Sequence, residues 1–304
     1  MLTDLTDTTT ADIRAALSKA QGQMGGPATG VVLNLIIVTD ESGQHDAVRA
    51  ASQASREHPC RVLGVIARES RTSSRLDAEI RSGEGTPGQT VLLRLYGPMS
   101  EHADSVIMPL LVPDTPVVTW WHGLIPPVPS TQPLGLLARR RVTDAARSRA
   151  PAEALAALSA GYQPGDTDFS WTRATPWRSL LAATVDQESS PVAGGRVIAE
   201  PDNPTAELLT AWLGSRLEAP FSRETSDGPG ITGVVLSTDA GDVVISRPDG
   251  RVATLSRPGQ PDRHVALHRR EIADLLAEEL RRLDPDEIYG ESLALVAGIP
   301  ATTG

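Results

Sequence analysis

The sequence of 304 residues contains a single cysteine, Cys60. One thiol excludes a disulfide within the chain, and it excludes a zinc site built from several cysteines of one chain. A protein without disulfides suits a reducing compartment, so we expect it in the cytoplasm. Cys60 begins an apolar segment, which favours a buried and unreactive thiol, because a nucleophilic cysteine needs an activating base and partial exposure.

Long apolar runs and excess positive charge are also lacking. No apolar segment approaches the roughly 20 residues that cross a bilayer. The first 17 residues contain acidic side chains and no apolar core of the kind found in secretion signals. The formal net charge is −10, which opposes both the phosphates of nucleic acids and anionic lipid surfaces. We therefore expect neither a nucleic acid nor a membrane as partner.

Motifs for nucleotide binding and catalysis are missing as well. The first strong strand, at residues 31–38, is followed by "TDESGQHD", which places three carboxylates where a dinucleotide fold places glycines and a phosphate. No GxxxxGK[ST] or GxSxG sequence occurs. His264 and His268 are four positions apart, but on a strand their rings would lie about 13 Å apart, too far to share an ion. The sequence therefore predicts no enzyme, no cofactor and no metal.

The order of apolar and amphipathic segments predicts an α/β fold with two domains. We place them at residues 1–165 and 166–304, each with a mixed or largely antiparallel sheet packed with helices. Nearly continuous apolar strands at 31–38 and 60–67 flank a helix at 45–58, which predicts a parallel strand–helix–strand unit. Residues 75–81 alternate between apolar and charged side chains, as in a strand with one wet face.

The remaining elements follow from the same patterns. Further strands are expected at residues 90–97, 116–121, 196–200, 230–237, 242–247, 251–257 and 263–268. Further helices are expected at residues 10–20, about 100–110, 133–161 and 270–283, and from Thr175 and Asn203 onward, the last two with proline in the first turn. The break "QPGDTD" at 163–168 marks the predicted domain boundary.

Aromatic residues make up only 3% of the chain, yet two tryptophans are adjacent, in the segment Trp120, Trp121 and His122. Neighbours on a strand point to opposite faces of a sheet, so the two rings cannot enter the same core layer. A central strand would cover both rings. A strand at an edge or beside the domain boundary would leave one ring for a partner, so these three residues are candidates for an interface as well as for the core.

Two further clusters are candidates for a partner surface. Arg139 and Arg140 fall on the outer side of the predicted helix at 133–161, either as a solvated face or as a docking site for an acidic partner or a phosphate. Trp171, Arg173 and Arg178 combine the residue types enriched at binding hot spots. A hydrophobic contact that ties the two domains together explains Trp171 equally well.

Several segments resemble the glucose-6-phosphate dehydrogenase assembly protein (OpcA) family, in the family's order and nearly end to end. The most specific are "REHPCR", "PDTPVVTWWHG" and "WTRATPWR". The resemblance implies a two-domain, non-catalytic partner that helps glucose-6-phosphate dehydrogenase reach or keep its active oligomeric form, in support of the oxidative pentose phosphate pathway. The alternative function is a sensor that binds a sugar phosphate or nucleotide through the arginine cluster.

Overall fold

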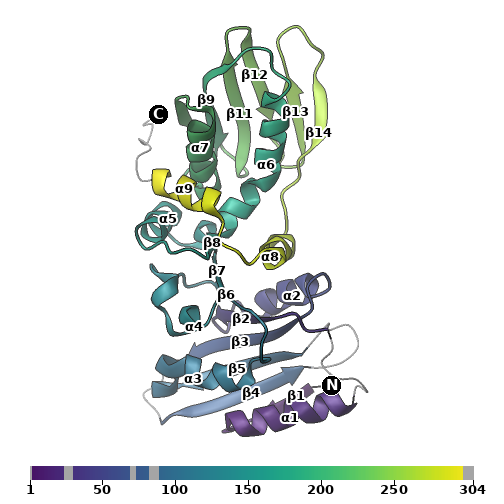
Figure 1. Cartoon of the computed structure of the whole chain (residues 1–304), viewed down its shortest axis with the longest axis vertical. Helices are drawn as coiled ribbons and strands as arrows, with labels where there is room; N and C mark the ends of the chain where they lie inside the picture. Colours follow the sequence, from purple (N-terminus) through teal and green to yellow (C-terminus); the bar gives the residue numbers. More distant parts are fainter. Residues whose placement is uncertain (1, 24–29, 69–72, 82–88, 297–304) are drawn as a thin grey trace. The chain divides into compact units, whose positions relative to one another are not determined.

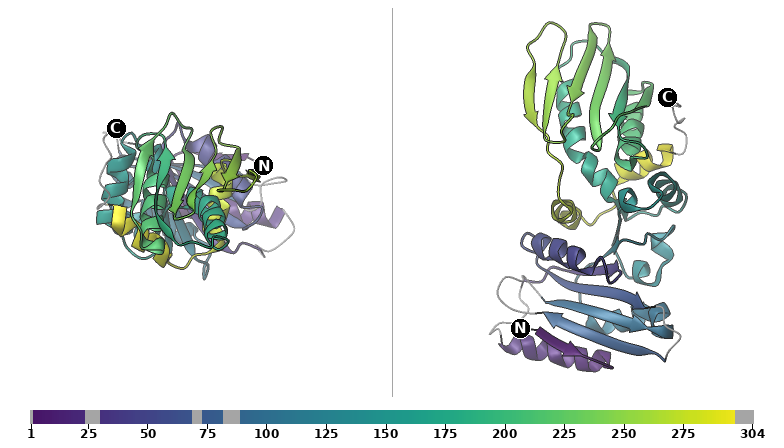
Figure 2. Two further views of the ribbon diagram at one scale, coloured as in Figure 1. Left: turned by 90° about the horizontal axis from the view of Figure 1, so that it is seen from above. Right: turned by 180° about the vertical axis from the view of Figure 1, so that it is seen from behind.

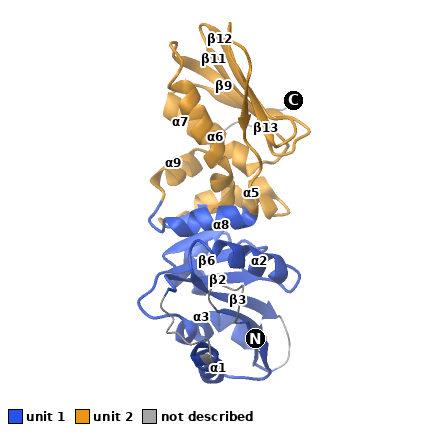
Figure 3. Ribbon diagram, turned by 90° about the vertical axis from the view of Figure 1, so that its right-hand side faces the viewer, with its two compact units in different colours: residues 1–144, 165–167, 272–285 blue, residues 145–164, 168–271, 286–304 orange. Residues whose placement is uncertain are grey.

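The computed structural model describes residues 2–23, 30–68, 73–81 and 89–296 (Figure 1). It forms two compact units, each assembled from separate stretches of the chain (Figure 3). Unit 1 contains residues 1–144, 165–167 and 272–285, and unit 2 contains residues 145–164, 168–271 and 286–304. Each unit has a mixed sheet packed with helices, so the predicted α/β class is confirmed. A boundary between independently folding domains at residue 165 stays a prediction.

The sheet of unit 1 has eight strands in the order β1-β4-β5-β3-β2-β6-β7-β8. Strand β2 pairs in parallel with β3 and β6, whereas β4 is antiparallel to β5 and β1. The predicted parallel strand–helix–strand unit is therefore present as β2, α2 and β3. The strands are β1 (Leu2–Leu5), β2 (Leu33–Thr39), β3 (Cys60–Arg68), β4 (Arg75–Arg81), β5 (Thr90–Tyr96), β6 (Val117–His122), β7 (Arg140–Thr143) and β8 (Asp166–Asp168).

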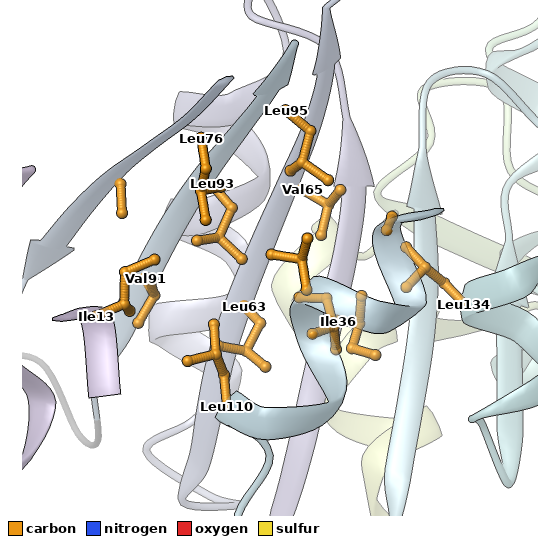
Figure 4. Packing of buried hydrophobic residues seen from close by; sticks show 14 of the residues in the cluster. Ile13, Ile36, Leu63, Val65, Leu76, Val91, Leu93, Leu95, Leu110 and Leu134 are labelled. Atoms are coloured by element: carbon orange, nitrogen blue, oxygen red, sulfur yellow. The ribbon is translucent and has the colours of Figure 1, made fainter. Parts of the chain in front are cut away.

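Helices cover both faces of this sheet. On one face, Ile13 of α1 (Thr10–Gln23), Val106 of α3 (Ala103–Ile107) and Leu134 of α4 (Pro133–Leu136) pack on apolar side chains of the central strands (Figure 4). The other face carries α2 (Gln44–Ala54), whose buried alanines allow close approach to the strands, and α8 (Ile272–Arg281) packs beside α2. Since both faces are covered, the central strands are apolar almost throughout.

The sheet of unit 2 has six strands in the order β10-β9-β11-β12-β13-β14, and only β9 and β10 run parallel. Helices α6 (Phe169–Val185) and α7 (Pro204–Leu217) pack on one face, with Trp177 and Leu209 against Val234 and Ile245. Helices α5 (Pro151–Ala160) and α9 (Glu287–Val296) complete the unit. The strands are β9 (Val192–Ala199), β10 (Phe221–Thr225), β11 (Ile231–Thr238), β12 (Gly241–Ser246), β13 (Val252–Ser256) and β14 (Arg263–Ala266).

The helix predicted at 133–161 is wrong over its middle part. Helix α4 stops at Leu136, and residues 140–143 form β7, which pairs in parallel with β6. The backbone N–H of Arg139 donates to Val117 O and that of Arg141 donates to Gly165 O, so sheet bonds replace helical ones. Helical periodicity could not reveal these partners because they lie more than 20 residues away along the chain.

Smaller differences concern element ends and short elements. Helix α6 begins at Phe169 rather than Thr175, because Asp168 caps it by accepting a hydrogen bond from the Ser170 N–H, and Pro176 lies inside the helix. The segment at 100–110 is split into the 3₁₀ turns η1 (Gly97–His102) and η2 (Met108–Leu110) around α3. Two more 3₁₀ turns are η3 (Pro129–Thr131) and η4 (Ala145–Arg147). Strands β1, β8 and β10 and helix α9 were not predicted.

Gly135 of α4 lies in a tightly packed position, and a substitution there tests the packing of α4 against Trp121 of β6. A Cβ atom there would overlap the carbonyl oxygen of Pro129 and lie 3.3 Å from the Trp121 ring. We expect Gly135→Ala to destabilise the protein by about 1–3 kcal/mol, because the backbone on both sides must move. Urea denaturation measures the change. In Gly22→Ala, the control in α1, the added Cβ meets no atom within 4 Å, so this variant should be neutral or slightly stabilising.

Candidate functional site

The sheet of unit 1 has a point at which the strand order changes direction. Strand β2 is flanked by β3 and β6, both parallel to it, so its C-terminal end and that of β6 border the crevice where doubly wound sheets bind ligands. The segment from Thr39 to Gly43 and the end of β6 at His122 lie there. We call these residues the switch-point site.

A carboxylate of the chain occupies the N-terminal end of α2 at this site. Asp40 Oδ1 accepts hydrogen bonds from Ser42 Oγ and from the Gly43 N–H, both at 2.7 Å. These two bonds lower the pKa of Asp40, the hydroxyl having the larger effect. In nucleotide-binding folds, N–H groups at this end of the first helix bind a phosphate. Here the Gly43 N–H is already bound to the protein's own anion.

The space around Gly43 is also filled. A Cβ atom at Gly43 would lie 2.8 Å from Thr39 Oγ1 and 3.1 Å from the His122 ring. The His122 ring in turn meets the Trp120 ring edge-on, with 4.9 Å between the ring centroids. Side chains therefore pack against the glycine, where a dinucleotide site needs room for a pyrophosphate.

Glu41, the next carboxylate, is surrounded by donors. Its oxygens accept hydrogen bonds from Arg94 Nη2 at 3.0 Å and Gln44 Nε2 at 2.8 Å, and Arg68 Nη2 lies 2.7 Å away. Partial burial alone would raise the pKa of Glu41, but the bonds from Arg94, Arg68 and Gln44 lower it to about 2. A general base for use near pH 7 needs a much higher pKa, so Glu41 is poorly suited to that role.

Each arginine of the run at 139–141 has a carboxylate partner within unit 1. Arg140 Nε donates to Glu279 Oε2 at 2.7 Å, and Arg140 Nη1 donates to Asp284 O at 2.8 Å. Arg139 pairs with Asp284 and Arg141 with Asp166. Arg140 and Glu279 are both about 95% enclosed, so this ion pair is buried. The run therefore ties β7 to α8 and β8, and its charges are neutralised internally.

The adjacent tryptophans lie on opposite faces of β6, as expected for a strand. Trp121 lies near Gly135 on the α4 side, whereas Trp120 shares its face with His122. All three are at most 4% exposed. Within this chain the three side chains are therefore covered, and their role at an interface stays a prediction.

The second aromatic cluster lies inside unit 2. Trp171 Nε1 donates to Asp286 Oδ2 at 2.8 Å, and the Arg178 guanidinium lies 3.7 Å above the Trp171 ring. Tyr289 of α9 lies beside the same ring. Trp171 is therefore a buried contact between α6 and α9. Arg173 and Arg178 are partly exposed, so part of each side chain is accessible to a partner. Arg139 of unit 1 is exposed as well, and the contact of these three arginines with a partner stays a prediction.

Other reactive groups are isolated or protected in the part of the chain that the structure describes. Burial raises the pKa of the Cys60 thiol to about 11, which keeps it protonated, and Ser55 Oγ lies 2.9 Å from its sulfur. No group of three or more His, Cys, Asp or Glu side chains is placed to hold a metal ion within the described ranges. None of the helices drawn in Figure 1 combines the length and apolar character of a membrane span.

Comparison with known proteins gives two family matches. Residues 51–160 match the model of the glucose-6-phosphate dehydrogenase subunit N-terminal domain, and residues 164–293 match that of the corresponding C-terminal domain. The search of curated proteins gives no match.

Two solved structures are similar at low identity. They are a mutant 3-ketoreductase from Actinomadura kijaniata, with 10% identity and a TM-score of 0.48, and an NAD-binding oxidoreductase from Klebsiella pneumoniae, with 11% identity and a TM-score of 0.44. In both cases the match covers 88% of this chain and 96% of the other. Similarity this low says nothing about the activity or ligands of this chain.

The buried Arg140–Glu279 pair can be tested by a double-mutant cycle. We expect Arg140→Met and Glu279→Leu each to destabilise the protein by about 3–5 kcal/mol, because each leaves one buried charge without its counter-charge. The variant with both changes should be destabilised less than either single variant. Urea denaturation of the two single variants and the double variant gives the three values. A loss of stability in the double variant equal to the sum of the two single losses would show that the pair is not coupled. The exposed pair Arg49–Asp46 is the control, and Arg49→Ala should change stability by less than about 1 kcal/mol.

The lowered pKa of Glu41 predicts a dependence of stability on pH. A carboxyl whose pKa falls from 4.5 to about 2 on folding stabilises the native state above pH 4.5, and this contribution is lost as the pH falls towards 2. Wild type should therefore exceed Glu41→Gln in stability at pH 6, and the difference should shrink between pH 4.5 and 2. Urea denaturation at each pH measures it. A constant difference across this range would contradict the prediction.

Proposed function

Because the chain belongs to the glucose-6-phosphate dehydrogenase assembly (OpcA) family, we propose that it is a non-catalytic partner of glucose-6-phosphate dehydrogenase. In this proposal it binds the dehydrogenase in the cytoplasm and favours the enzyme's active oligomeric form, in support of the oxidative pentose phosphate pathway. The two family matches together extend over residues 51–293, so both units take part in the resemblance.

The observation that best supports a non-catalytic role is the state of the switch-point site. The position that receives a nucleotide phosphate in related topologies is bound by Asp40, and the neighbouring Glu41 carries a second negative charge. A phosphate would have to displace one carboxylate and approach another. The arginine run offers no replacement site, because its three guanidinium groups already contact Asp284, Glu279 and Asp166. This weakens the alternative of a phosphate-binding sensor.

Activation by such a partner has a thermodynamic requirement. A protein that binds the active form of an enzyme and not the inactive form stabilises the active form by RT ln(1 + [L]/Kd), about 2.7 kcal/mol at a concentration of 100 Kd. Equal affinity for both forms would shift nothing. The proposal therefore needs selective binding to the active oligomer.

The test uses the dehydrogenase from the same organism. We expect the two proteins to co-elute in size-exclusion chromatography, and we expect the dehydrogenase to show higher activity and a larger share of active oligomer when this chain is added. If the two proteins do not co-elute and the rate of the dehydrogenase does not change, the proposal loses its basis.

A second measurement separates partner from sensor. Thermal unfolding of this chain alone should be unchanged by NADP or glucose 6-phosphate, because Asp40 and Glu41 occupy the switch-point site. A clear rise in melting temperature with either ligand, in the absence of the dehydrogenase, would favour the sensor.

A further inference from the structure

One face of the six-stranded sheet in unit 2 is bare. Helices α6 and α7 pack on the face formed by Val234, Leu236 and Ile245, and none of the described helices of unit 2 packs on the opposite face (Figure 2, right). The strand register identifies the residues of this second face, which we call the open face. They are Ser222, Glu224, Gly194, Arg196, Ile198, Gly233, Val235, Ser237, Asp242, Val244, Ser246, Val252, Thr254, Ser256, His264 and Ala266.

The side chains of the open face are short and mostly uncharged. Neighbouring strands place Val235 beside Val244 and Gly233 beside Ser246, and Ser246 in turn pairs with Thr254. A solvated face of an antiparallel sheet ordinarily carries long charged side chains, which prevent non-specific association with other proteins. The middle of this face, in a chain whose residues are 22% charged, has Val244 and Ser246 beside Val235, which is only 2% exposed.

The open face also has a hollow, towards one end of its strands. A cavity of about 280 Å³ is lined there by Ile198, Gly233, Val244 and Ser246 of the sheet and by Ser226, Gly228 and Pro248 of the adjoining loops. Ile198 packs on Gly233, because its Cδ1 atom lies 3.3 Å from the position that a Cβ of Gly233 would take. A hollow of this kind can receive a projecting apolar side chain of another protein.

Apart from the Arg196–Glu224 ion pair, charge lies at the rim of the open face, where it is mainly negative. Arg196 and Glu224 pair with each other at 2.7 Å, so they add no net charge. Exposed carboxylates lie around the face at Asp227, Asp239, Asp242, Asp249 and Asp262, against the exposed cations Arg251, Arg263 and Arg269 and the imidazole of His264. The face therefore has a neutral centre and an acidic rim.

We propose that the open face is the surface on which glucose-6-phosphate dehydrogenase docks, through a flat, uncharged patch bordered by basic residues. This inference rests on the function proposed above. A second copy of this chain is a poorer occupant, because it would bring acidic rim against acidic rim and combine two chains of net charge −10.

The strands alone supply part of the area that a specific complex needs. Six strands about 4.8 Å apart, with four to eight residues rising about 3.3 Å each, give a sheet of roughly 24 by 20 Å, or about 480 Å². An ordinary interface takes ~800 Å² from each partner, so the turns around the face would have to contribute the rest.

The main test places a cation at the centre of the face. Ser246 is exposed on β12, and Ser215 is exposed on α7, on the other side of the sheet. We expect Ser246→Arg to raise the dissociation constant for the dehydrogenase at least tenfold in biolayer interferometry. Ser215→Arg should change this constant less than about twofold. Melting temperatures verify that both variants fold. If Ser246→Arg does not fold, Thr254→Arg takes its place in the experiment.

The possible outcomes distinguish the two proposals. If the wild-type chain does not bind the dehydrogenase, the proposed function fails. If wild type binds and both arginine variants on the open face bind equally well, the docking surface is elsewhere. If the wild-type chain alone is a dimer that Ser246→Arg converts to a monomer, the open face is occupied by a second copy and the inference is wrong.

The acidic rim gives a second, kinetic readout. We expect Asp239→Lys to slow association with the dehydrogenase several-fold at low salt, with a smaller effect at high salt, because rim charges act mainly on the association rate. Glu153→Lys, an equal charge change on α5, is the control. Equal effects of both variants would show that only the net charge of the chain matters, and would overturn the assignment of a basic partner rim to this face.

Discussion

Unit 1 depends on the buried ion pair between Arg140 of β7 and Glu279 of α8. Each charge is almost fully enclosed, and either one alone would cost several kcal/mol to keep away from water. The two residues are 139 positions apart in sequence, and all the strands of the unit 2 sheet come between them along the chain. The chain therefore leaves unit 1, forms most of unit 2 and returns with α8, which packs beside α2. Arg139 and Arg141 support the same junction through Asp284 and Asp166.

The same unit has the topology of a ligand-binding sheet without the local chemistry of one. Strand order creates a topological switch point at the ends of β2 and β6, but Asp40 binds the helix N-terminus and the ring of His122 fills the space beside Gly43. The two solved structures of low similarity do not bear on this point. A partner protein needs surface instead, and the open face of unit 2 offers short, mostly uncharged side chains around Val244 and Ser246.

Much of the fold could be predicted because its signals are local. The apolar strands β2 and β3, the alternating strand β4 and the four strands from β11 to β14 were predicted within a few residues. The cap at Asn203 was also visible, and its side chain accepts from the Ala206 N–H. Strand β7 was missed because Leu137, Ala138, Val142 and Ala145 occur at helical spacing, and only the pairing with β6 makes residues 140–143 a strand.

The candidate site divides in the same way. The sequence alone determined that carboxylates follow the first strong strand, that one thiol cannot form a disulfide, and that Trp120 and Trp121 must face opposite sides. Each of these follows from residue type and local backbone geometry. Only the tertiary structure decided that both rings are covered, that the three arginines are neutralised, and that one face of the second sheet is bare. Burial and charge pairing depend on residues brought together from distant parts of the chain, which local periodicity does not encode.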